Sequence, residues 1–163
     1  MPGNESDLQT QVADYLRLQY PGVMFHSDFG SGIKLTPGQA AKQKRQNGGR
    51  RAWPDMFIAE ANIVIPTDTA TANKYNEAHW VCFGHQKGER KKPALVVMGG
   101  LFLELKKEGT RLKKKNGEWA TPHIAEQAKA LEELRQRGYC AEFAVGFEEA
   151  KRIIDEYLGE KRQ

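Results

Sequence analysis

The segment Leu95–Lys106 places the tightest constraint on the fold of this 163-residue chain. Only 39% of the residues are apolar, yet Ala94–Leu103 is an apolar run interrupted by only two glycines. Such a run between polar segments is typical of a core β-strand, and Gly99–Gly100 would allow two strands joined by a turn. A membrane span would need about 20 apolar residues. The run therefore predicts the centre of a buried sheet.

The rest of the chain alternates helical patterns with short apolar stretches. Helices are expected from Glu5 to the stop at Pro21-Gly22, over Gln39–Gln46, from Pro122 to the stop at Gly138, and over Glu148–Leu158, and further strands at Val23–His26, Met56–Ala59 and Cys140–Val145. Residues 61–93 show no clear period, and we expect an insertion in which Ile63–Ile65 and Trp80–Phe83 form a hairpin. The order predicts one α/β domain over residues 1–163, with helices on both faces of a mixed, partly parallel sheet.

Basic residues gather in two segments, although the net charge is only +4. Lys42–Arg51 holds five basic residues and no acid, and Arg111–Lys115 holds four. Such clusters favour a polyanionic partner, and they also occur in solvated loops. The DNA-contacting candidates are Lys42, Lys44, Arg45, Arg50, Arg51, Lys113 and Lys114.

The first residues and the cysteines favour a soluble, cytoplasmic protein. The start, Met1–Asp7, is polar and acidic, which is unlike a secretory leader. Cys82 and Cys140 are too few for a disulfide framework, and reduced thiols are the simpler interpretation.

Glu104 and Lys106 carry the first chemical signal. Side chains alternate between the faces of a strand, so both lie on the face that also carries Phe102. Burying a carboxylate and an ammonium together is costly unless they are used, although a strand that emerges into solvent would explain the same pattern.

Asp55 strengthens the functional interpretation. It follows Pro54 at the start of another predicted core strand, and Pro-Asp followed by Glu-x-Lys is the signature of the PD-(D/E)xK nucleases. Two carboxylates, Asp55 and Glu104, offer hard oxygen ligands for Mg²⁺ or Mn²⁺. Lys106 would orient or deprotonate the attacking water and stabilise charge on the phosphate.

Further segments extend this similarity over nearly the whole chain outside residues 61–93. They are Asn4–Gln9, Leu16–Pro21, Ala52–Asp55, Gly100–Lys106, Glu126-Gln127 and Leu134–Tyr139. In this order they closely resemble the VRR-NUC branch of that superfamily, in the small stand-alone form found in phages and prophages. The resemblance implies a restriction-endonuclease-like core, a catalytic glutamine at Gln127, and a first-helix acid at Glu5 that would reach the metal. The insertion and the basic loop Arg111–Trp119 depart from the family pattern and bear on substrate preference.

Two of these assignments keep an alternative. Gln127 falls on the apolar face of its helix with Ile124 and Leu131, where a core glutamine bonded to the backbone would also fit. An acid in a first helical turn is ordinarily explained by the helix dipole, and Asp7 competes with Glu5 for the same role.

The function we expect is that of a divalent-metal-dependent DNA endonuclease. Its rivals are a DNA-binding module that keeps the fold without cleaving, and a structural protein with an ion pair at Lys106. The resemblance further implies a homodimer that prefers branched DNA such as four-way (Holliday) junctions. The apolar residues of the insertion are the candidate interface, namely Ile63, Val64, Ile65, Trp80, Val81 and Phe83.

Overall fold

The computed structural model describes residues 5–27, 36–46, 53–64, 80–81 and 95–159. The elements in chain order are α1 (Glu5–Gln19), β1 (Phe25–Ser27), α2 (Pro37–Gln46), β2 (Met56–Ile58), β3 (Asn62–Val64), β4 (Trp80–Val81), β5 (Leu95–Met98), β6 (Leu101–Lys106), α4 (Pro122–Arg135), β7 (Cys140–Val145) and α5 (Phe147–Gly159). None of the described helices is both long and apolar enough to cross a membrane.

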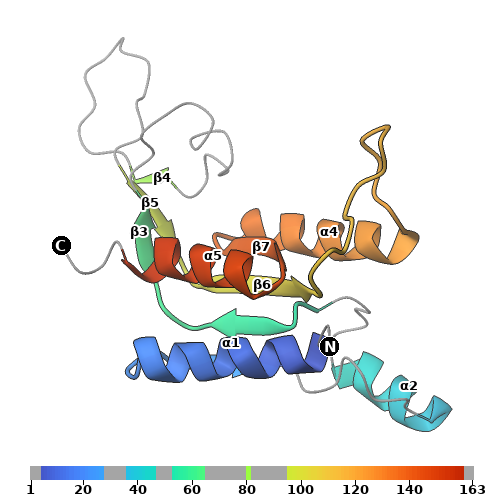
Figure 1. Cartoon of the computed structure of the whole chain (residues 1–163), viewed down its shortest axis with the longest axis horizontal. Helices are drawn as coiled ribbons and strands as arrows, with labels where there is room; N and C mark the ends of the chain where they lie inside the picture. The colour runs from blue at the N-terminus through green and yellow to red at the C-terminus, as the bar shows by residue number, and fades with distance from the viewer. Residues whose placement is uncertain (1–4, 28–35, 47–52, 65–79, 82–94, 160–163) are drawn as a thin grey trace.

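The main sheet has four strands in the order β1-β2-β6-β7. The β1–β2 and β2–β6 pairs are antiparallel, whereas β6 and β7 are parallel, so the sheet is mixed as the sequence predicts. Helices α1 and α5 contact each other and cover one face, and α4 covers the other (Figure 1). The helices therefore lie on both faces of the sheet.

The alternation along β6 divides the core in two. Leu101, Leu103 and Leu105 are fully buried in the larger cluster, which α1 and α5 complete. Phe102 points the other way, into a smaller cluster with Leu131 of α4. The predicted division of side chains between the two faces of this strand is thus confirmed, and burial of both faces marks β6 as the central strand.

The apolar run does break into two strands at Gly99–Gly100. A Cβ atom on Gly100 would lie 2.8 Å from the Ile58 carbonyl oxygen and 2.5 Å from the Phe57 ring, so only glycine fits beside β2. The chain can therefore leave β5 and enter the main sheet at once as β6.

The predicted hairpin within residues 61–93 is wrong. β3 and β4 do not pair with each other; each pairs antiparallel with β5, in a separate three-stranded sheet of order β3-β5-β4. The physical reason is that β5 is the more apolar strand and has two edges, so β3 and β4 can each form backbone hydrogen bonds with one edge of it. Ile65 and Phe83, which the prediction included, lie outside the described residues.

Candidate active site

The candidate site forms where β2 begins and β6 ends. Glu104 and Lys106 project from the β6 face that α4 covers, and both are buried, with 3% and 6% of their surfaces exposed. β2 pairs with β6 through Met56 and Leu103, so Asp55, one residue earlier, falls opposite Glu104. The sheet register alone brings together the two carboxyl groups that the sequence predicts to act jointly.

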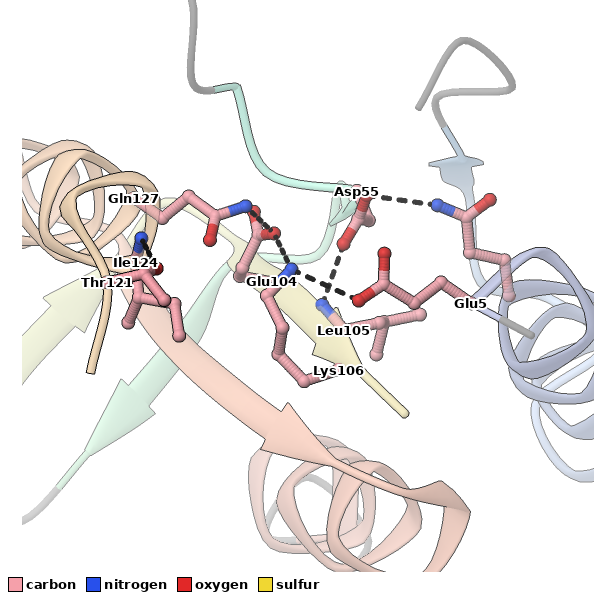
Figure 2. Close-up of polar contacts among 9 residues, drawn as sticks. Glu5, Asp55, Glu104, Leu105, Lys106, Thr121, Ile124 and Gln127 are labelled. Carbon is pink, nitrogen blue, oxygen red and sulfur yellow. Dashed lines mark hydrogen bonds and ion pairs between the residues drawn. The ribbon is translucent and has the colours of Figure 1, made fainter. Parts of the chain in front are cut away.

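Backbone and side-chain bonds fix the Asp55 carboxylate. Its Oδ2 accepts a 2.8 Å hydrogen bond from the Leu105 backbone N–H (Figure 2). Its Oδ1 accepts a 3.0 Å hydrogen bond from Gln9 Nε2 on α1. Only 7% of Asp55 is exposed. Both oxygens are therefore held before any ligand arrives.

Lys106 links the acids of the site. Its Nζ lies 2.8 Å from Glu104 Oε1 and 3.5 Å from Glu5 Oε1, as Figure 2 shows. Glu5 opens α1, and its side chain is 45% exposed. Of the two first-turn acids, Glu5 thus reaches the site, whereas Asp7 lies on the exposed side of the helix.

Gln127 reaches the site from α4, on the face of the sheet from which Glu104 projects. Thr121 caps α4, because its Oγ1 accepts a 3.1 Å hydrogen bond from the Ile124 N–H, and Pro122 follows in the first turn. From the buried face of this helix, Gln127 donates a hydrogen bond through Nε2 to Glu104 (Figure 2). Its Oε1 is buried and, among the described residues, has no hydrogen-bond partner.

Burial dominates the protonation of the site. Desolvation, followed by the Coulomb repulsion of Asp55, raises the pKa of Glu104 to about 8. Desolvation also raises the pKa of Asp55, although its bond to Leu105 and the charge of Lys106 oppose the rise. Desolvation alone would lower the pKa of Lys106, but its hydrogen bond and charge attraction to Glu104 raise it. Without an added cation, the site therefore favours retaining a proton on Glu104.

The donor set fits a hard divalent cation. Asp55 and Glu104 offer carboxylate oxygens whose repulsion a cation would relieve, and the Gln127 Oε1 atom is a buried acceptor that still needs a partner. No group of three or more His, Cys, Asp and Glu side chains stands ready to hold a metal in the described part of the chain. In this conformation Glu5 pairs with Lys106 instead, so a direct metal contact from Glu5 stays a prediction.

The predicted DNA-contacting residues lie outside this buried cluster. Lys42 and Arg45 are exposed on α2, and Lys113 and Lys114 are exposed on the loop between β6 and α4. In Figure 1 that loop and α2 are at the end of the molecule where α1 begins and β6 ends. Arg50, Arg51 and the side chain of Lys44 lie outside the described residues.

Gln9 is the site residue that the sequence interpretation missed. It lies four residues after Glu5, on the buried face of α1 with Leu8 and Val12. A polar residue at an apolar position of an amphipathic helix was the signal available, and the same reasoning did identify Gln127.

A comparison with solved structures supports the fold. The chain matches a solved protein described as "VRR_NUC domain protein" with a TM-score of 0.50 and 22% sequence identity, over 98% of this chain and 91% of that chain. Neither a protein-family model nor a curated protein matches the sequence. The chain therefore has a mixed α/β fold like that of a VRR_NUC protein, as the sequence resemblance implies.

Proposed function

We propose that this protein is a divalent-metal-dependent endodeoxyribonuclease, with Mg²⁺ as its cofactor and Mn²⁺ as a substitute. The observation that carries the proposal is the buried Asp55–Glu104 pair, with Lys106 Nζ 2.8 Å from Glu104 and with the buried Gln127 Oε1 atom, which has no hydrogen-bond partner among the described residues. A protein that needed these groups only for stability would gain little from burying two repelling carboxyl groups. The nuclease-like fold supports the same conclusion.

Asp55 and Glu104 would hold the cation, and Glu5 would approach it if its ion pair with Lys106 opened. When bound, a divalent cation supplies Lewis acidity toward a phosphate oxygen and lowers the pKa of water. The protein supplies the orientation, because the two Asp55 oxygens are already fixed by Gln9 and by the Leu105 N–H.

Lys106 and Gln127 would act on the water and the phosphate. With its charge retained, Lys106 Nζ stabilises negative charge that develops on the phosphodiester. Its release from Glu104 would free the charged Nζ to orient the attacking water, whereas Nζ could take a proton from that water only after losing one of its own. Gln127 Oε1 would accept a hydrogen bond from that water while Nε2 continues to hold Glu104.

The exposed basic residues would bind the DNA backbone without reading its sequence. Lys42 and Arg45 on α2, with Lys113 and Lys114 on the loop before α4, supply positive charge near the end of the molecule that holds the site. We assign the same role to Lys44, Arg50 and Arg51 on sequence grounds, within a single nuclease domain of residues 1–163.

The test is cleavage of linear, nicked, flapped and four-way DNA in Mg²⁺ or Mn²⁺, with a chelator control. We expect strand breaks that need the cation and disappear in Asp55→Asn. DNA binding without breaks under every condition would overturn the nuclease assignment and favour a binding module that keeps the fold. Cleavage that persists in the chelator would overturn the metal dependence.

We also propose that the protein acts as a homodimer on branched DNA. One pair of carboxylates per chain supports one strand cut per encounter, and a two-fold dimer would match the approximate symmetry of a four-way junction. Val97 of β5 is 43% exposed in the three-stranded sheet, next to the residues assigned to the interface. Light scattering and relative rates on junction and linear DNA test this proposal. A monomer that cuts both substrates equally would contradict it while leaving the nuclease assignment intact.

A further inference from the structure

Gln9 makes a contact that the proposed chemistry does not itself require. Only 7% of the residue is exposed, and its Nε2 donates a 3.0 Å hydrogen bond to Asp55 Oδ1. The contact joins α1 to the start of β2, across 46 positions of sequence. A glutamine buried at this cost in desolvation and side-chain entropy needs a compensating role.

The bond completes the immobilisation of Asp55. The Leu105 N–H holds Oδ2, which leaves Oδ1 as the oxygen that a rotation of the carboxyl group would displace. With Gln9 in place, that rotation would break hydrogen bonds to both oxygens. The lone pairs that neither donor uses are therefore held in one orientation, on a residue that the strand register places opposite Glu104.

The chemistry of the donor is as informative as its position. An amide donates a hydrogen bond without adding charge, so it orients a carboxylate and leaves its negative charge for a cation. Glu104 also accepts a hydrogen bond from a neutral amide, that of Gln127, but its Oε1 lies 2.8 Å from the charged Lys106 Nζ as well. A lysine or arginine at position 9 would hold Asp55 more tightly but would also neutralise it.

We propose that Gln9 is a positioning residue for the cation site: it fixes Asp55 toward a divalent cation without competing with that cation for the charge of Asp55. The inference rests on the proposed function. Loss of a partner that orients a metal ligand typically weakens metal binding about 10- to 100-fold.

The experiment is calorimetric titration of the whole chain with Mn²⁺ in the absence of DNA, together with the thermal midpoint of each metal-free variant. Gln9→Leu removes the hydrogen bond at similar volume, and Gln9→Lys replaces the neutral donor with a charged one. Gln11→Leu is the matched control on the exposed face of α1, and Val12→Ala is a core control that weakens packing away from Asp55.

We expect Gln9→Leu to bind Mn²⁺ about 10- to 100-fold more weakly, and Gln9→Lys to lose binding while its metal-free midpoint rises. A purely structural residue would not give this opposite pair of effects. Gln11→Leu should match the wild type, and Val12→Ala should lower the midpoint with little change in Mn²⁺ affinity.

Two results would overturn the inference while the proposed function stands. One is wild-type Mn²⁺ affinity in Gln9→Leu, and the other is an equal loss of affinity in Val12→Ala. If Gln9→Lys does not fold, Gln9→Leu decides the matter alone. Failure of the wild-type protein to bind Mn²⁺ at all would overturn the inference and the metal-dependent function together.

Discussion

The carboxylate site and the basic surface are built in opposite ways. Asp55, Glu104 and Lys106 are buried, and each is tied to groups from at least one other part of the chain. Lys42 and Lys113 are exposed, on elements that lie outside the main sheet. The groups that the proposed chemistry needs in a fixed geometry are thus buried at paired strands of the main sheet, whereas the basic groups proposed to act at longer range are at the surface.

The two basic segments also differ from each other. The loop before α4 is held by its own backbone, since the Lys114 N–H donates to the Glu118 carbonyl and the Ala120 N–H to that of Leu112. Trp119 anchors it against Phe143 of β7, and Lys113 lies over the Trp119 ring. The described side chains of α2 are all exposed, so this helix depends on local bonds such as the cap between Thr36 and Gln39. The loop therefore holds its basic residues on a backbone that packs against β7, whereas α2 holds its basic residues on a helix stabilised by local bonds.

The largest expected effect comes from the carboxyl groups. Asp55→Asn and Glu104→Gln should each lower the cleavage rate by roughly a thousandfold or more, because the cation loses a ligand and contributes several kcal/mol to such reactions. The metal-free midpoint should stay the same or rise, since either change relieves the repulsion between the two groups. Glu126→Gln, an exposed neighbour of Gln127, is the matched control for kinetics and calorimetry. Cleavage at the wild-type rate in either site variant would show that the altered carboxyl group is not needed for catalysis, so the buried site would no longer differ from the surface in this respect.

Loss of Lys106 should separate catalysis from metal binding. Lys106→Ala should lower turnover by about a hundredfold through the lost stabilisation of developing phosphate charge, while Mn²⁺ still binds. Cleavage assays at saturating Mn²⁺, with calorimetry on the same preparation, check both halves. Abolished Mn²⁺ binding would instead show that Lys106 is needed to shape the cation site.

A smaller effect follows from the protonation of Glu104. Its pKa is about 8 in the folded chain and 4.5 ordinarily, so between these values the folded protein keeps a proton that the unfolded chain has released. The free energy of unfolding contributed by Glu104 is therefore fully present below about pH 4.5 and is lost as pH rises toward 8. In a chelator, the wild-type midpoint should fall by several degrees relative to Glu104→Gln between pH 5 and 8.5. If the thermal midpoints of the wild type and of Glu104→Gln changed with pH in the same way, burial would not perturb this carboxyl group.

The smallest effects belong to single basic residues. In an Asp55→Asn background that cannot cut, Lys42→Ala or Lys113→Ala should each reduce the slope of log affinity against log salt by about 0.9 on duplex DNA. Arg17→Ala, an exposed change near the far end of α1, should leave the slope unaltered. Unchanged slopes in both lysine variants would show that Lys42 and Lys113 do not contact DNA phosphates and are ordinary solvated surface residues.

Local patterns in the sequence accounted for much of the fold and for the identity of the main groups. Alternation along β6 placed Glu104 and Lys106 on one face and the leucines on the other, and the helix limits at Pro21 and Pro122 follow from backbone chemistry. The same patterns failed in residues 61–93, where β3 and β4 pair with β5 instead of with each other. Short apolar strands do not carry information about their partner in their own sequence.

The sequence by itself determined which side chains were available and which face of a strand or helix each would occupy, because those depend on neighbours a few residues away. Only the tertiary structure decided that the Gln9 amide holds Asp55 and that Gln127, 23 positions away in sequence, holds Glu104. It also decided how strongly burial raises the pKa of Glu104. Contacts and desolvation of this kind depend on how separate elements pack against one sheet, and no periodicity within a single element records that packing.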